Sequence, residues 1–119
     1  MTNYIFGAKA IAISVCKAWK AIYPEEGIQG FVVSDMAGNP KELLGLPVLQ
    51  IDELAECQSQ EEKVNTQMII ATPEDVHEAI VKTLQRYGYR SYKRMDSVEE
   101  SELMEKYFRQ QGRFRVLHD

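Results

Sequence analysis

The chain has 119 residues, of which 45% are hydrophobic, and a formal net charge of −4. This length suits one compact domain over residues 1–119 and leaves no room for a second domain of ordinary size. The acidic balance disfavours a nucleic-acid partner, and the longest apolar runs are far shorter than the about 20 residues that cross a bilayer.

Short apolar strands alternate with helical patterns along the chain. Residues 4–6 predict a strand, and residues 10–22 predict a helix because apolar side chains recur there at helical spacing up to Pro24. Further strands are expected at residues 28–34, 46–50, 68–71 and 89–93, and further helices are expected to begin at Asp52, Thr72 and Ser97.

This alternation predicts an α/β fold. Strands joined by helices form parallel sheets with right-handed crossovers, and the natural order of five such strands is 3-2-1-4-5. We therefore expect a single Rossmann-like domain of three layers, with helices on both faces of the sheet.

Two helix starts carry clear signals. Thr72 is expected to cap the helix after the fourth strand, with Pro73 at the first helical position and an acid two residues later. Ser97 is expected to open the last helix in a capping box, and the inward side chains of that helix are expected to be Leu103, Met104, Tyr107 and Phe108.

The last residues, 113–119, alternate like a strand but lack a following turn or partner. Two hypotheses follow. The chain is the N-terminal module of a longer protein that holds a catalytic domain, or the tail serves a subunit contact, as in a homodimer.

Residues 86–119 are mildly basic, and arginines and lysines alternate there with tyrosines. Such a pattern can bind nucleic acid through phosphate contacts and base stacking. A solvated helix end and edge strand is the preferred interpretation because the whole chain is acidic.

The cysteines and histidines predict no metal centre. Cys16 and Cys57 form neither a C-x-x-C pair nor a metal-ligand spacing, and only His77 and His118 could add nitrogen ligands. Because no targeting segment opens the chain, we expect a cytoplasmic protein with free thiols.

The opening of the chain resembles a dinucleotide-binding turn. In the pattern G-x-G-x-x-G/A, Gly7 fills the tight turn and Ala12 the helix-packing position, but Lys9 stands where a second glycine lets a pyrophosphate approach. Lys9 has two interpretations: its ammonium pairs with a phosphate, or its stem fills the place of the pyrophosphate and leaves a vestigial site.

A ligand would bind at the carboxyl ends of the strands, where the strand order reverses. The residues expected there are Gly7, Ala8, Lys9, Ala10, Asp35, Thr72 and Pro73. The first amides of the helix that begins at Ala10 favour an anion such as a phosphate.

Asp35 ends the second strand, 23 residues after Ala12, near the spacing of the acid that accepts hydrogen bonds from a ribose. This acid argues against a 2′-phosphate, so a nicotinamide cofactor would be NAD. The alternative is an aspartate that merely stabilises the turn before Gly38.

No catalytic residues are expected. His77 lies in the first turn of its helix and should face solvent, or else the ligand crevice. No serine near a strand end has a partner base in the sequence, so nucleophilic catalysis is not predicted.

Four segments together resemble a known bacterial domain: Y-I-F-G-A-K at residues 4–9, G-F-V-V-S-D at 30–35, L-L-G-L-P-V-L at 43–49 and M-I-I-A-T-P at 68–73. The chain resembles the N-terminal nucleotide-sugar-binding domain of sugar acyltransferases that carry a left-handed β-helix. It is also similar to Rossmann modules of surface-polysaccharide glycosyltransferases and sugar dehydrogenases.

The resemblance implies a bacterial polysaccharide-biosynthesis role in which Gly7 and Ala8 face the ligand phosphates and Asp35 meets the nucleoside. The family turn carries further glycines, often followed by a histidine, whereas this chain has Lys9-Ala10-Ile11. The chain also lacks β-helix repeats, so acyl or glycosyl transfer would belong to another domain.

Three functions remain open from the sequence. The first is a non-catalytic module that binds a nucleotide or nucleotide sugar for a transferase. The second is an NAD-binding oxidoreductase or redox-sensing domain, and the third is a degenerate Rossmann domain that acts in protein association.

Overall fold

The structure, a computed structural model, describes residues 1–112 as an α/β domain. Its strands are β1 (Thr2–Phe6), β2 (Ile28–Val33), β3 (Glu42–Leu43), β4 (Leu46–Gln50), β5 (Thr66–Ile70) and β6 (Ser91–Arg94). Its helices are α1 (Ala10–Ile22), α2 (Ile51–Cys57), α3 (Gln60–Val64), the 3₁₀ turn η1 (Glu74–Val76), α4 (His77–Arg86) and α5 (Ser97–Gln110).

The six strands form one sheet in the order β3-β4-β2-β1-β5-β6. This differs from the predicted order of five strands, 3-2-1-4-5, although the α/β class agrees. The difference is β3, a two-residue strand that pairs antiparallel with β4, whereas all other pairs are parallel. Periodicity could not reveal so short a strand, because its pairing depends on the turn at Leu44-Gly45, where both residues have positive φ.

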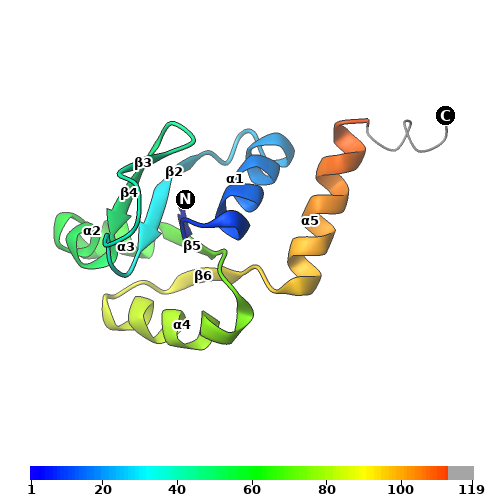
Figure 1. Cartoon of the computed structure of the whole chain (residues 1–119). Helices are drawn as coiled ribbons and strands as arrows, with labels where there is room; N and C mark the ends of the chain where they lie inside the picture. Colours follow the sequence, from blue (N-terminus) through cyan, green and yellow to red (C-terminus); the bar gives the residue numbers. More distant parts are fainter. Residues whose placement is uncertain (113–119) are drawn as a thin grey trace.

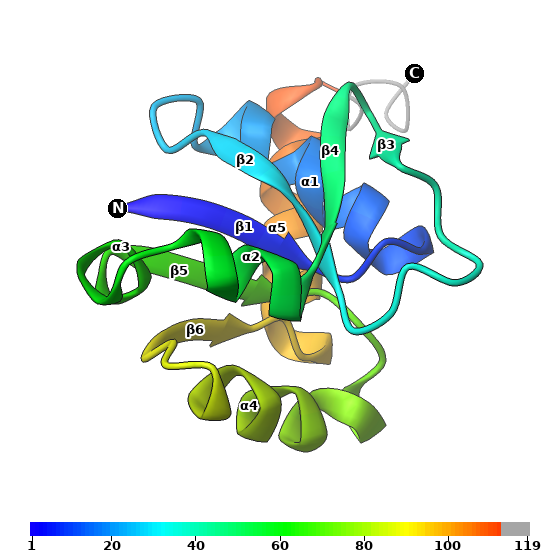
Figure 2. The ribbon, with the colours of Figure 1, turned by 90° about the vertical axis from the view of Figure 1, so that its left-hand side faces the viewer.

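Helices cover both faces of the sheet and give three layers (Figure 1). On one face, α1 and α5 lie side by side and pack on a core cluster that includes Ile5, Phe31 and Ile69. On the other face, α2 and α4 pack on a second cluster that includes Phe6 and Val32. Figure 2 shows the sheet from the side of α2, with α1 and α5 behind it.

Two helix starts differ from the sequence prediction. Pro73 has an extended backbone, so the chain passes through η1 and α4 begins only at His77 rather than at Thr72. Asp96, not Ser97, caps α5: its carboxylate accepts a hydrogen bond from the Glu99 amide at 2.9 Å. An acid one residue before the expected cap provides the same acceptor, and the sequence pattern does not separate the two.

The stretch at 56–65 holds the end of α2 and the short helix α3, which a capping box between Ser59 and Glu62 opens. In α5 the inward residues are Leu103, Met104 and Tyr107, whereas Phe108 is 41% exposed. The strand and subunit contact predicted for 113–119 lie outside the described residues. Among the described residues, none of the helices is long and apolar enough to cross a membrane.

Candidate ligand site

The candidate site lies where β1 and β5 end beside each other. The chain leaves β1 toward α1 on one face of the sheet and leaves β5 toward α4 on the other face. Since the two connections diverge, a crevice opens at the carboxyl ends of these strands, which is the usual ligand position in open parallel sheets. Six of the seven predicted site residues lie here, and the seventh, Asp35, lies on the neighbouring loop after β2.

Gly7 holds the β1–α1 connection against the β5–α4 connection. Its φ is +130°, and a Cβ atom at this position would lie 2.6 Å from the carbonyl oxygen of Ala71. No side chain fits without moving the backbone, so the glycine is required for the close approach of the two connections. The tight turn predicted at Gly7 is therefore present, and Ala12 is fully buried at the packing position.

The N-terminus of α1 has no side-chain cap. Lys9 occupies the N-cap position with an extended backbone, and the first turn contains no acidic residue. Lys9 and Ala10 are exposed, whereas Ala8 is buried. The first amides of α1, together with the helix dipole, therefore favour an anion at this end of the helix.

The side chain of Lys9 reaches across to the loop after β2. Its Nζ atom donates a hydrogen bond to the carbonyl oxygen of Gly38 at 3.2 Å, at an exposed position. Within residues 1–112 no carboxylate forms an ion pair with this ammonium. An ammonium has three N–H donors, so Lys9 keeps donors for a further acceptor.

A cavity of about 360 Å³, here called the α4 cavity, opens between this loop and α4. Its floor and walls are largely apolar, and the residues with polar side chains are Lys9, Ser34, Asn39, Thr72 and Thr83. This composition suits a flat ring system held by a few hydrogen bonds. Its lining residues are Phe6, Gly7, Ala8, Lys9, Val33, Ser34, Asn39, Thr72, Val76, Ala79, Ile80 and Thr83.

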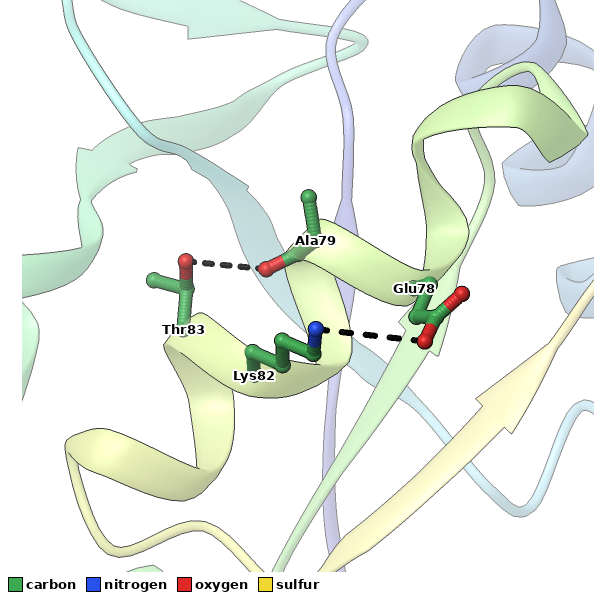
Figure 3. A network of polar contacts seen from close by, with 4 residues as sticks. All are labelled: Glu78, Ala79, Lys82 and Thr83. Carbon is green, nitrogen blue, oxygen red and sulfur yellow. Dashed lines mark hydrogen bonds and ion pairs between the residues drawn. The ribbon is translucent and has the colours of Figure 1, made fainter.

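On the α4 side of this cavity, one hydroxyl group forms a hydrogen bond within the helix. Thr83 donates its hydroxyl hydrogen to the carbonyl oxygen of Ala79 at 3.1 Å, and both residues line the cavity (Figure 3). The neighbouring pair Glu78 and Lys82 forms an exposed ion pair at 3.9 Å. The residues of η1 and α4 that line the cavity are therefore uncharged.

A second cavity, here called the α1 cavity, lies on the other side of the Gly7–Lys9 turn and measures about 310 Å³. It is lined by Gly7, Ala8, Lys9, Ala10, Ile11, Ala71, Thr72 and Pro73. Gly7, Ala8, Lys9 and Thr72 line both cavities, so the two cavities adjoin at these residues.

Asp35 is exposed and lines neither cavity. One carboxylate oxygen accepts a hydrogen bond from the Ala37 amide at 2.9 Å, and its carbonyl oxygen accepts one from the Asn39 side chain at 2.9 Å. These hydrogen bonds stabilise the turn, which is the alternative role that the sequence suggested for Asp35. Asp35 follows the cavity-lining residue Ser34 directly in the chain.

His77 does not face solvent or the crevice, contrary to the sequence prediction. Its ring is buried, and Nε2–H donates to the carbonyl oxygen of Thr72 at 2.7 Å. Thr72 therefore presents its side chain near both cavities while its carbonyl is occupied. The histidine has a structural role in the β5–α4 connection.

Sequence reasoning missed the α4 wall. Val76, Ala79 and Thr83 line the α4 cavity, and Val76 is 40% exposed. The helical spacing of these three residues was a usable signal, and it was obscured by the 3₁₀ turn that shifts the start of α4. Among the described residues, no group of three or more His, Cys, Asp or Glu side chains is arranged to hold a metal ion.

No family model and no curated protein matches the sequence. Solved structures are similar in fold. A mutant of perosamine N-acetyltransferase from Caulobacter crescentus, in complex with CoA and GDP-perosamine, matches with a TM-score of 0.56 and 18% identity over 75% of this chain and 40% of that chain. PerB from the same organism, with the same two ligands, gives a TM-score of 0.54.

RSP, a Rex-family repressor, matches 97% of this chain and 62% of its own length, with a TM-score of 0.60 and 10% identity. This chain thus spans 40% of the acetyltransferase and 62% of the repressor. At these identities the likeness shows a shared Rossmann-like fold.

Proposed function

We propose that this chain is a nucleotide-binding module that holds a nucleotide or nucleotide sugar for a bacterial transferase of polysaccharide biosynthesis. One observation carries the proposal: an apolar cavity adjoins an uncapped helix N-terminus at the reversal of the strand order. The cavity suits a nucleobase, and the amides of α1 suit its phosphates. The fold likeness to an acetyltransferase solved with GDP-perosamine supports this ligand class.

The module is not itself catalytic in this proposal. Among residues 1–112, those that line the two cavities include no carboxylate, histidine or cysteine. Lys9 is the one charged residue among them, and it has no base or nucleophile beside it. Acyl or glycosyl transfer would therefore need residues of a catalytic domain in a longer parent chain.

A ligand panel tests the proposal. Thermal unfolding is measured with UDP, GDP, CMP and dTDP sugars, the free nucleotides, NAD, NADP and coenzyme A. A ligand at about 100 times its dissociation constant adds about 2.7 kcal/mol to the free energy of unfolding. Stabilisation by one nucleotide class supports the proposal, and no stabilisation by any nucleotide contradicts it and favours a role in protein association.

Asp35 provides a matched pair of variants for this test. Asp35→Asn keeps an oxygen that can accept from the Ala37 amide, whereas Asp35→Ala removes it. If Asp35 binds a ribose hydroxyl through its charge, both variants should abolish the ligand-dependent stabilisation. If Asp35 acts only in the turn, the asparagine variant should keep the ligand-dependent stabilisation.

NAD is a second candidate ligand. A glycine turn after β1 and an acid after β2 are the elements that recognise a dinucleotide, and the repressor likeness covers 97% of this chain. In the same panel, stabilisation by NAD without any by nucleotide sugars would select this candidate. Turnover of NADH by the parent protein would then identify an oxidoreductase, and its absence a sensing domain.

A further inference from the structure

We infer that Lys9 makes this site selective for a nucleotide that ends in a phosphate, such as a nucleoside diphosphate, over one whose diphosphate is esterified at both ends. The inference rests on the proposed function, because it concerns the same site. It narrows the ligand class: the module would hold the free nucleotide more tightly than a nucleotide sugar or NAD.

The first argument is steric. A ligand esterified at both ends must pass its diphosphate over the β1–α1 turn, with one substituent in the α4 cavity and the other beyond the turn. Glycine at the second position of the pattern makes room for this passage. Lys9 instead has a Cβ atom on an ordinary extended backbone, and the residue lines both cavities.

The second argument is electrostatic. Among residues 1–112, the Lys9 ammonium has one hydrogen bond, to the uncharged Gly38 carbonyl, and Lys9 lines the α4 cavity from the N-cap position of α1. A terminal phosphate carries a charge of about −1.5 to −2 near neutral pH because its second pKa is about 6, whereas an esterified one keeps only its first ionisation. The ammonium and the helix N-terminus together therefore gain more from a terminal phosphate.

The same contact couples ligand binding to the loop after β2. Lys9 ties Gly38 to the start of α1, while Gln50 accepts a hydrogen bond from the Met36 amide at 3.0 Å. A phosphate that binds the ammonium would weaken the hydrogen bond from Lys9 to Gly38 and leave the hydrogen bond between Met36 and Gln50 in place. The loop would remain attached through Gln50, and only the Lys9 contact would change.

Isothermal titration calorimetry on paired probes tests the inference. The pairs are ADP and ADP-ribose, GDP and GDP-mannose, and UDP and UDP-glucose, each titrated into the wild-type chain. We expect the diphosphate of at least one pair to bind about tenfold more tightly than its ester, as one charge-assisted hydrogen bond would provide.

Two variants separate charge from bulk. Lys9→Met keeps the stem and should remove most of the preference, whereas Lys9→Gly opens the turn and should bind the ester at least as tightly as the diphosphate. Lys17→Met is the matched control, because Lys17 is exposed on the same helix but two turns from the site, and it should keep the preference.

Esters that bind the wild type as tightly as diphosphates, or more tightly, would overturn the inference and leave the proposed function standing. A preference that survives in both Lys9 variants would also overturn it. If no probe binds at all, the proposed function itself fails, and the inference fails with it.

Discussion

Two neighbouring strand-to-helix connections differ in what they offer a ligand. The β1–α1 connection has a helix N-terminus without a side-chain cap or a first-turn acid, and an exposed lysine. In the β5–α4 connection, Glu74 and Asp75 lie in a 3₁₀ turn. The Thr72 carbonyl accepts a hydrogen bond from the His77 ring, and the Glu74 carboxylate accepts one from the Ser97 amide.

Two neighbouring connections of one sheet therefore differ in how well they can accept an anion: the β1–α1 connection favours one and the β5–α4 connection does not. Glu74 and Asp75 in η1 repel an anion, and two donors near them, the His77 ring and the Ser97 amide, are already used in internal hydrogen bonds. At the start of α1 the amides and the Lys9 ammonium remain available. We therefore place the ligand phosphates at α1, with the apolar wall of α4 beside the base.

Replacing Gly7 should have the largest effect, because it is the point where the two connections touch. Gly7→Ala combines a positive φ with a contact of 2.6 Å to the Ala71 carbonyl. We expect a loss of about 2–4 kcal/mol in the free energy of unfolding, measured by urea denaturation.

Gly27→Ala is the matched control for this variant. Gly27 has no left-handed φ, and a Cβ atom there would meet nothing within 4 Å. It should change the free energy of unfolding by less than about 1 kcal/mol. Equal losses in the two variants would show that Gly7 does not set the contact between the connections.

Replacing His77 should destabilise the β5–α4 connection. His77→Phe keeps a buried ring but leaves the Thr72 carbonyl without its donor, at a cost of about 1–3 kcal/mol in urea unfolding. Lys82→Met, which removes only the exposed ion pair with Glu78, should cost less than about 1 kcal/mol. A stable His77→Phe variant that has lost ligand affinity would assign the histidine to the site instead.

The opposite edge of the sheet offers a pH test. Burial, with smaller contributions from Tyr4 and Glu62, raises the pKa of Tyr89 to about 12, and its hydroxyl donates to Gln58. The unfolded chain loses the Tyr89 proton near pH 10, whereas the folded chain keeps it, so the free energy of unfolding falls as the pH rises from 10 toward about 12.

Tyr89→Phe isolates this effect. Urea denaturation across the same pH range should show a shallower decline in the variant, because the remaining tyrosines titrate in both proteins. We expect the variant to be less stable by about 1 kcal/mol at neutral pH, where the Gln58 hydrogen bond is lost. Parallel curves for the two proteins would contradict the assignment of the raised pKa to Tyr89.

Lys9→Asp should have the smallest effect on stability and a clear effect on binding. An aspartate at this N-cap can accept from the free amides of α1 and should add about 0.5–1 kcal/mol in urea unfolding. The same carboxylate would occupy the position proposed for the ligand phosphate and repel that phosphate, so nucleotide affinity should fall. A variant that is more stable and still binds the nucleotide would place the phosphates elsewhere.

The sequence predicted the parallel layers because β-branched runs and helical spacing mark β1, β2, β5 and α1 directly. It also predicted which residues gather at the carboxyl edge, since topology alone brings Gly7 and Thr72 together. It did not predict β3, whose pairing depends on a local turn, or the 3₁₀ start of α4. The roles of Lys9 and His77 depended on partners, Gly38 and the Thr72 carbonyl, that only the folded chain brings within reach.

Amide NMR spectra of the chain titrated with ADP, GDP and UDP test the central claim most directly. A ligand at the proposed site should shift the amides around Gly7–Ile11, around Ser34–Asn39 and along the first turns of α4, which surround the two cavities. Shifts confined to Gln58–Thr66 and Gly88–Tyr92, at the opposite edge of the sheet, or no shifts with any nucleotide, would contradict it.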